Sequence, residues 1–198
     1  MAVQNNYEQL KKELVGLESI YQSNQIEYEI LKKSEDIQGF VENKNEALYY
    51  LLRDMYNGKI EKKYLDATLY YFINKTSYSG MLRFNSKGEF NVPFGRYKNF
   101  NTEIVSEEHR ALLRRTEITQ MDYSKVFERC STKDFVFLDP PYDCVFTDYG
   151  NVGENDFLEQ SQIKLAEDVR NLSAKSLMII GKTELTKKLY GPYIKAEY

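Results

Sequence analysis

The sequence predicts an α/β protein in which only part of a sheet is present. Two observations lead to this prediction. Apolar residues recur at helical spacing through much of the first hundred residues, and beyond residue 105 short apolar runs alternate with helical stripes, as in proteins built on a parallel sheet. Hydrophobic residues make up 42% of the 198 residues, so a core can form and the length suits one domain or slightly more.

The first part of the chain is predicted to be helical. An amphipathic helix is expected over residues 5–33, with a break near residues 23–24. Two apolar-rich helices, Ala47–Tyr56 and Tyr64–Phe72, are expected on either side of the turn signal Asn57-Gly58. We expect these helices to serve in packing.

Residues 75–98 differ from the rest of the chain in charge. Five basic residues against the single acidic Glu89 give this segment a net charge of +4, so that in a chain of net charge −3 the remaining residues sum to −7. Phosphates attract lysine and arginine, and interleaved aromatic side chains can stack on bases or wedge between them. The glycines and Pro93 predict a loop or hairpin. On charge alone, nucleic-acid contact and an irregular solvated surface explain the segment equally well.

The second half is predicted to alternate between helices and strands. The run Phe135–Leu138 is apolar throughout and flanked by polar residues, as a buried parallel strand should be, and Ser176–Ile180 is expected beside or near it in a three-layer arrangement. The other expected elements are helices at Glu107–Arg115, Tyr123–Arg129, after an N-cap at Asp156, and at Glu184–Tyr190, an extended segment at Glu117–Met121 and a third strand at Tyr193–Tyr198.

Composition excludes several kinds of site. Cys130 and Cys144 are the only cysteines and His109 is the only histidine, so the chain can assemble neither a Cys/His zinc site nor a histidine-based triad, and we expect no metal. The glycines do not form a phosphate-cradling loop. No apolar run approaches the roughly 18 residues of a membrane helix, so we expect no membrane association and a cytoplasmic location.

The sharpest local feature is the run Asp139-Pro140-Pro141-Tyr142, which directly follows the predicted strand at Phe135–Leu138. Open parallel sheets bind ligands beyond the carboxyl ends of their strands, where Asp139 falls. The prolines fix φ and offer carbonyl acceptors without N–H donors. Such a corner can hold an exocyclic amine by hydrogen bonds to Asp139 and the Pro140 carbonyl, with Tyr142 stacked on the attached ring. Taken alone, the tetrapeptide is also an ordinary proline-rich turn.

Three motifs together resemble the Dam-type (class D12) DNA adenine-N6 methyltransferases. The block Gly88–Lys98, GEFNVPFGRYK, is similar to one in that family, and the DPPY corner follows it in the family's order. The resemblance runs from about Tyr7 to Tyr198. Upstream of the block, the family pattern N-[RK]-x-x-[YF]-x-G-x-x-R-[YF]-N is matched by Asn74, Lys75, Tyr78, Gly80, Arg83, Phe84 and Asn85.

The resemblance implies a partial Rossmann-like, S-adenosylmethionine-dependent methyltransferase sheet with an inserted helical and hairpin DNA-recognition lobe. It assigns residues 1–39 to the N-terminal helical part of the methyltransferase domain, 40–105 to the target-recognition lobe and 106–198 to the catalytic α/β part. The family's W-x-G-G-K-like and F-x-G-x-G cofactor segments have no match in this sequence. We therefore expect a fragment, a split protein or a degenerate copy, or a second chain that supplies the cofactor-binding half.

The implied reaction transfers a methyl group from S-adenosylmethionine to the N6 amine of an adenine flipped out of duplex DNA. By resemblance, Asp139, Pro140, Pro141 and Tyr142 form the catalytic corner, and Asp139 also contacts the amino group of the cofactor. The similar members modify GATC, so we expect that target. The DNA-binding residues implied are Lys75, Tyr78, Ser79, Arg83, Asn85, Lys87, Arg96, Tyr97 and Lys98.

The matched positions suggest separate roles in DNA recognition. Arg83 is expected to read a base edge, because arginine can donate two hydrogen bonds to guanine. Tyr78 is expected to act as a wedge in the duplex. Ser79 replaces an asparagine that is frequent in the family, and Glu89 is open to two interpretations, as an acceptor from a cytosine amine or as the partner of a nearby lysine. The remaining basic residues, Lys75, Lys87, Arg96 and Lys98, are expected to clamp phosphates.

Two alternatives remain, one from another functional class and one that keeps catalysis but changes the substrate. The chain could be a non-catalytic DNA-binding remnant, which the missing glycine motif favours for this polypeptide by itself. It could also be an N-methyltransferase acting on protein glutamine or on cytosine, against which Asp139 and the upstream block argue. The expected partners are double-stranded DNA, a second chain with the cofactor half and a cognate restriction endonuclease.

Overall fold

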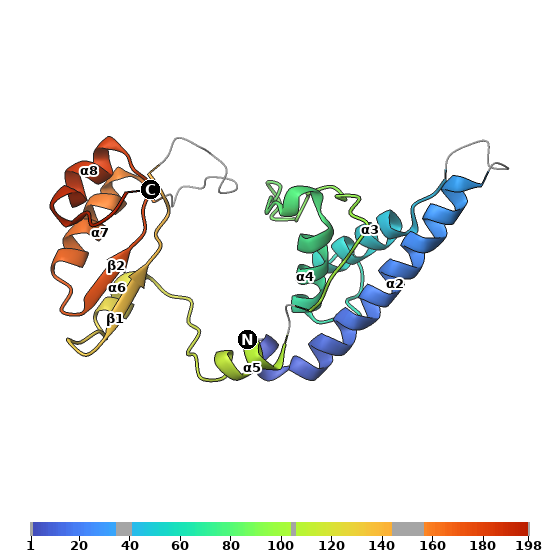
Figure 1. Ribbon diagram of the computed structural model, residues 1–198, viewed down its shortest axis with the longest axis horizontal. Helices are drawn as coiled ribbons and strands as arrows, with labels where there is room; N and C mark the ends of the chain where they lie inside the picture. The colour runs from blue at the N-terminus through green and yellow to red at the C-terminus, as the bar shows by residue number, and fades with distance from the viewer. Residues whose placement is uncertain (1, 35–40, 104–105, 144–156, 198) are drawn as a thin grey trace. The chain divides into compact units, whose positions relative to one another are not determined.

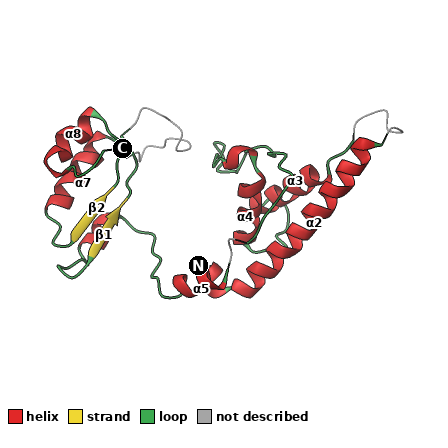
Figure 2. Cartoon of the chain, in the orientation of Figure 1, coloured by secondary structure: helices red, strands yellow, loops and turns green. Residues whose placement is uncertain are grey.

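The computed structural model describes residues 2–34, 41–103, 106–143 and 157–197. The chain forms two compact units, Met1–Ile118 and Thr119–Tyr198. The first is helical, whereas the second combines helices with a small parallel sheet (Figures 1 and 2). The three functional regions expected above stay a prediction. The α-helices of the first unit are α1 (Ala2–Asn5), α2 (Tyr7–Lys33), α3 (Lys44–Tyr56), α4 (Asp66–Thr76) and α5 (Glu107–Leu113), and a short 3-10 helix covers Tyr78–Gly80.

The core of the first unit lies where α3 and α4 pack on α2, as the apolar spacing predicted (Figure 1). Tyr21 of α2 meets Phe72 of α4 edge-on, with ring centroids 6.0 Å apart, and Phe72 and Phe100 are 4.9 Å apart. Such edge-to-face contacts add to the stabilisation that burial provides. The buried members of this core are Leu10, Leu14, Leu17, Tyr21, Tyr49, Leu52, Met55, Leu69, Phe72, Ile73, Phe90, Val92, Phe94 and Phe100.

The predicted break at residues 23–24 is wrong, because α2 runs without interruption from Tyr7 to Lys33. A contact with α3 explains the difference. The fully buried Asn45 donates from Nδ2 to the Tyr21 carbonyl at 3.0 Å, and its Oδ1 accepts from Nδ2 of Asn24 at 3.0 Å. Asn24, a weak helix former, therefore gains a tertiary partner within the helix.

Two buried tyrosines make the first unit sensitive to alkaline pH. Tyr21 and Tyr49 are each 0% exposed, and their hydroxyls donate to the carbonyls of Tyr97 and Val92. Burial raises the pKa of each from its ordinary value of 10.0 to about 12. The unfolded chain therefore loses these protons at lower pH than the folded chain, so that stability falls as pH rises.

We expect the free energy of unfolding of this unit to fall between about pH 10 and pH 12, while these two phenols stay protonated in the folded state. Urea denaturation at a series of pH values, followed by phenolate absorbance, measures this. Tyr49→Phe serves as the control, because removing the ionisable hydroxyl should make the decline shallower. A free energy of unfolding that does not change across this range would contradict the expectation.

The second unit is built on two parallel strands. β1 (Phe135–Leu138) pairs with β2 (Lys175–Met178), with Phe137 opposite Leu177, so the two predicted strands are neighbours as expected. α7 lies between them in sequence. The second strand begins one residue and ends two residues before the range predicted for it, Ser176–Ile180. The other elements are α6 (Tyr123–Phe127), α7 (Glu159–Arg170), α8 (Glu184–Tyr190) and a 3-10 helix at Gly191–Tyr193.

One face of this sheet is open, which corrects the prediction of buried strands in three layers. Phe135 and Phe137 are 64% and 57% exposed, and Leu177 on β2 is 49% exposed. Alternate residues of a strand point to opposite faces, so these three side chains share one face. Within the second unit, no described residues form a third layer over it, although the apolar run predicted burial on both sides.

The other elements expected in the second half are confirmed only in part. The helix at Glu184–Tyr190 is confirmed, whereas no strand forms at residues 194–197, because Gly191 and Pro192 begin a 3-10 helix after α8. Glu117–Met121 forms no strand. Asp156, the expected N-cap, lies outside the described residues, and α7 begins at Glu159.

No helix in the described ranges combines the length and apolar character that crossing a membrane requires.

Candidate catalytic corner and nucleic-acid interface

The run Asp139–Tyr142 forms a corner at the carboxyl end of β1. The end of the strand is fixed by its neighbour, because the Ile179 N–H donates to the Leu138 carbonyl at 3.0 Å. Asp139, the next residue, is exposed, and Tyr142 is half-buried. A carboxylate therefore stands in solvent at the edge of the sheet where open α/β proteins bind their ligands.

Two hydrogen bonds hold the corner on either side of Tyr142. Gln162 of α7 donates from Nε2 to the Pro141 carbonyl at 2.8 Å, and Thr183 donates from Oγ1 to Oδ2 of Asp143 at 2.7 Å. One of the two carbonyl acceptors that the sequence predicts, that of Pro141, is thus already bound by Gln162. Of the two carbonyls, the one at Pro140 is the acceptor that the chemistry proposed below uses.

The loop beneath Tyr142 is held by the start of α8. Thr183 is the N-cap of that helix, accepting from the Thr186 N–H, and the Thr186 hydroxyl donates to the Gly181 carbonyl at 2.8 Å. The backbone of Gly181 lies against Tyr142, where a Cβ atom would stand 3.5 Å from Cβ of the tyrosine. This ordered loop supports the ring from one side.

Sequence reasoning missed the residues that support the corner. The sequence does indicate that Gln162 is buried, because it falls on the apolar stripe of its helix with Leu165, Ala166 and Val169, at the spacing where a core residue is expected. It is 0% exposed. For Thr183 the sequence indicates only the start of a helix, since an N-cap threonine does not show which loop it contacts.

The hydrogen-bond acceptors at the corner fit an amine. The Asp139 carboxylate and the Pro140 carbonyl accept hydrogen bonds and donate none, and Tyr142 offers a flat aromatic face beside them. The carboxylate also fits the positively charged amino group of S-adenosylmethionine. These groups can position an amine and stabilise positive charge that develops on it.

The DNA-recognition candidates lie in the first unit, outside the β1–β2 sheet. Ser77 pairs with Phe94 and Phe84 with Phe90 in isolated antiparallel bridges, so the segment folds back on itself as the predicted hairpin does. Tyr78 is 58% exposed at the turn that follows α4. The structure thus presents one of the aromatic candidates to solvent.

The turn behind Tyr78 is braced by Tyr97. Ser79 has a φ of 54°, a backbone conformation that side chains rarely adopt, and its N–H donates to the Tyr97 hydroxyl at 3.1 Å. Gly95 cannot be replaced without movement, because a Cβ there would stand 2.6 Å from the Tyr97 ring and 2.7 Å from the Ser77 carbonyl oxygen. Tyr97 therefore has a structural partner, and its contact with DNA stays a prediction.

Arg83 and Asn85 are held in different ways. Asn91 accepts from Nε of Arg83 at 3.0 Å, which orients an exposed guanidinium. Asn85 organises the next turn, because its Oδ1 accepts from the N–H groups of Lys87 and Glu89 at 2.9 and 3.0 Å. The side chain of Asn85 is thus engaged in the turn, whereas that of Arg83 is exposed and donates to Asn91 from both Nε and Nη2.

The carboxylate of Glu89 has partners within the protein. Asn85 donates to it at 2.8 Å and Lys59 lies 3.4 Å away, and together they lower the pKa of Glu89. Of the two interpretations open from sequence, the structure contains the ion pair with a lysine.

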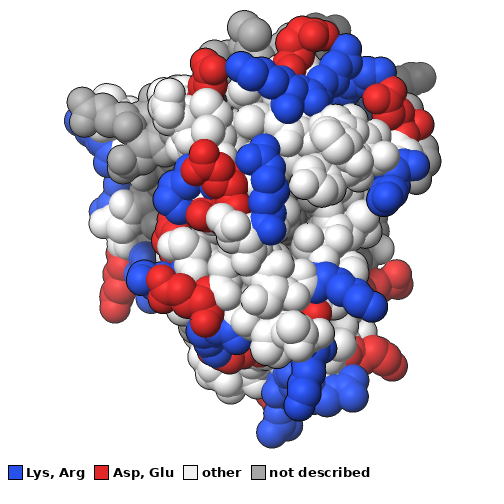
Figure 3. Space-filling view, turned by 90° about the vertical axis from the view of Figure 1, so that its left-hand side faces the viewer, with Lys and Arg blue, Asp and Glu red and all other residues white. Residues whose placement is uncertain are grey.

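Two of the expected phosphate clamps face carboxylates. Lys98 lies 3.3 Å from Glu29 and lowers the pKa of that glutamate, and Arg96 lies 3.9 Å from Glu46. Both basic side chains are 76% exposed, so the pairs are open to solvent and weak. Figure 3 faces the side of the second unit instead, and there too lysine and arginine are interspersed with aspartate and glutamate.

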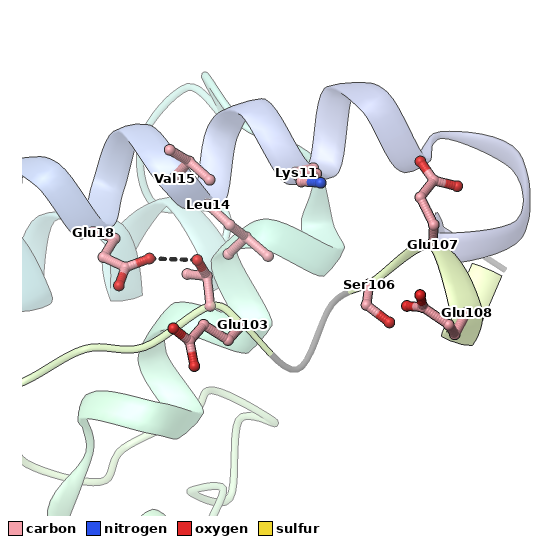
Figure 4. Close-up of a pocket in the computed structure, with 9 residues that line it drawn as sticks. Lys11, Leu14, Val15, Glu18, Glu103, Ser106, Glu107 and Glu108 are labelled. Carbon is pink, nitrogen blue, oxygen red and sulfur yellow. Dashed lines mark hydrogen bonds between the residues drawn. The ribbon is translucent and has the colours of Figure 1, made fainter.

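A hollow beside α2 contains none of the expected site residues (Figure 4). Four glutamates line it with the single cation Lys11, and the Thr102 hydroxyl donates to Glu18. This excess of negative charge repels phosphates, so the hollow does not suit DNA. Its lining residues are Lys11, Leu14, Val15, Glu18, Thr102, Glu103, Ser106, Glu107 and Glu108.

Several characterised proteins resemble this chain. The type II methyltransferase M.CviBI of Paramecium bursaria Chlorella virus NC1A is 39% identical over 171 residues, which cover 84% of this chain and 63% of that protein. The type II methyltransferase M.MjaIII of Methanocaldococcus jannaschii is 34% identical over 163 residues, 76% of this chain and 54% of that protein. A DNA adenine methylase of Salmonella typhi is 29% identical over 191 residues, 91% of this chain and 66% of that protein.

The chain therefore spans between 54% and 66% of the length of these three relatives. A family model covers nearly all of the chain, from residue 7 to residue 196. The match includes both the basic residues 75–98 and the corner at Asp139. The chain belongs to the D12 class of N6 adenine-specific DNA methyltransferases.

Proposed function

We propose that this chain carries the DNA-recognition and catalytic-corner parts of a site-specific DNA adenine-N6 methyltransferase. The observation that carries the proposal is the exposed Asp139 carboxylate at the carboxyl end of β1, followed by two prolines and Tyr142, in a chain of the D12 class. The names of the relatives favour a methyltransferase over a non-catalytic remnant.

The corner would act on the exocyclic amine of a flipped adenine. That amine is a poor nucleophile, because its lone pair is delocalised into the ring. Hydrogen bonds donated by the amine to Asp139 and to the Pro140 carbonyl favour a tetrahedral nitrogen whose lone pair points toward the methyl donor. Tyr142 would stack on the base. Asp139 holds the amine and stabilises the positive charge that develops on it, without first removing a proton.

S-adenosylmethionine, when bound, supplies the methyl group, and Asp139 is the residue of this chain that would contact its amino group. We propose that further polypeptide completes the cofactor site and packs on the open face formed by Phe135, Phe137 and Leu177. That face supports the proposal because an exposed cluster of large apolar side chains is a site of association. A second chain is one source of that polypeptide.

In the first unit, Tyr78 would wedge into the duplex and Arg83 would read a guanine edge of a GATC site. Ser79, Asn85 and Tyr97 would shape the turns that present these side chains, next to the DNA backbone. A cognate restriction endonuclease is a further proposed partner, because two relatives are named type II methyltransferases. The proposed phosphate clamps are Lys75, Lys87, Arg96 and Lys98.

Transfer of labelled methyl groups to a GATC duplex tests this function. The chain is assayed alone and together with the part of M.CviBI that it does not match, with a scrambled duplex as the control. We expect little transfer by the chain alone and transfer to the GATC duplex by the mixture or by a fusion of the two. Absence of transfer to any adenine-containing duplex by the fusion would contradict the function. Efficient transfer by the chain alone would contradict the proposed division of the cofactor site.

A further inference from the structure

Gln162 is a buried polar residue whose only described side-chain hydrogen bond reaches the corner. It is 0% exposed in the first turn of α7, and its Nε2 donates to the Pro141 carbonyl at 2.8 Å. Its Oε1 is buried and has no partner among the described residues. Burying an amide that uses only part of its hydrogen-bonding capacity opposes folding. An apolar side chain of similar size would suit this position of the stripe better, so packing alone does not explain a glutamine here.

The bond that Gln162 makes acts on the peptide plane that leads into Tyr142. Proline fixes its own φ, so the main freedom left at Pro141 is rotation about ψ, which sets the direction of its carbonyl and of the next residue. A hydrogen bond to that carbonyl restricts this rotation. Gln162 therefore influences the position from which the Tyr142 side chain leaves the backbone.

A second bond restrains the other side of the ring. Thr183, the N-cap of α8, donates to Asp143 at 2.7 Å, and the Gly181 backbone lies against Tyr142. Tyr142 thus stands between a residue held from α7 and a residue held from the start of α8. Both attachments restrain the corner, and without the bond from Gln162 the rotation at Pro141 is no longer restricted.

We propose that Gln162 is a positioning residue for methyl transfer, which fixes the Pro141 carbonyl so that Tyr142 stacks where the amine meets Asp139 and the Pro140 carbonyl. This inference rests on the proposed function. It assigns a chemical purpose to a buried amide on a helix that does not touch the reacting atoms. Misplacement of a reacting group by about 1 Å can reduce a rate about a hundredfold, so a positioning residue has a measurable effect.

The test compares Gln162→Leu and Gln162→Glu with Gln160→Leu in the fused enzyme described above. Leucine removes the donor and leaves an apolar side chain, and glutamate keeps the size but loses the N–H donor when ionised. Gln160 lies exposed in the same helix and serves as the matched control. We expect kcat to fall about 10- to 100-fold for both Gln162 variants, with the Kd for DNA and for S-adenosylmethionine within about twofold of the parent. Gln160→Leu should leave all three values unchanged.

A readout that does not depend on catalysis separates this inference from the proposed function. In NMR spectra of the chain alone, Gln162→Leu should shift the amide resonances of Tyr142 and Asp143, and Gln160→Leu should not. An unchanged kcat in an active enzyme, or unchanged Tyr142 and Asp143 resonances, overturns the positioning role. If the parent enzyme does not methylate, the proposed function fails by that result, and the positioning role in methyl transfer fails with it even where the resonances shift.

Discussion

Replacing Asp139 by alanine is expected to lower the rate of methyl transfer by the completed enzyme at least about a hundredfold, because the variant loses an acceptor that holds the amine and stabilises developing positive charge. The side chain is exposed, so its removal leaves the fold intact. Single-turnover methylation of a GATC duplex measures the effect, and thermal denaturation of the same sample checks the fold.

Two further variants define the role of this carboxylate. Asp139→Asn keeps an oxygen acceptor at the same place but removes the charge, so we expect a smaller loss of rate than with alanine. Asp134→Ala is the matched control, because Asp134 is an exposed aspartate at the opposite end of β1, where it accepts from the Ser131 N–H at 2.7 Å. Equal rates for Asp139→Ala and Asp134→Ala would exclude the proposed mechanism.

Local sequence signals predicted the parts of the fold that depend on neighbouring residues. Phe135–Leu138 and Glu184–Tyr190 form the expected strand and helix with the expected bounds, because a short apolar run and an apolar periodicity are properties of the segments themselves. The break expected at residues 23–24 failed for the opposite reason. Asn45, twenty-one residues away from Asn24, supplies the hydrogen bonds that keep α2 continuous.

The candidate site shows the same difference between features set by neighbouring residues and features set by distant contacts. The corner itself could be predicted, because the chemistry of Asp139 and the prolines is contained in four consecutive residues. The contacts that support it could not, since Gln162 and Thr183 reach the corner from 21 and 40 residues away, although the apolar stripe of the helix placed Gln162 at a core position. A charged or aromatic residue suggests a function by its type, whereas a supporting amide or hydroxyl acquires its role only from the fold.

Arg83 and Lys98 are expected to have different roles in DNA binding. Arg83→Ala is expected to reduce the preference for a GATC duplex over a scrambled duplex about 10- to 100-fold, because a bidentate contact with guanine contributes about 1–3 kcal/mol of discrimination. Asn91 already orients this guanidinium in the free protein, with Nε 3.0 Å from its Oδ1. Lys98→Ala is expected to weaken binding to both duplexes by a similar factor, because a phosphate contact carries no sequence information.

The salt dependence of binding separates the two roles further. The plot of log K against log salt concentration has a negative slope. Because Lys98→Ala loses one phosphate contact, the magnitude of that slope should decrease by about 1. Lys98 also neutralises Glu29, 3.3 Å away, so its removal leaves an unpaired carboxylate beside the DNA and adds repulsion that is strongest at low salt. Binding titrations of each variant with both duplexes at two salt concentrations give the preference and the slope together. If both variants lose the preference for GATC over the scrambled duplex equally, Arg83 and Lys98 do not have separate roles in base recognition and phosphate binding. The proposal that Arg83 recognises GATC is then wrong.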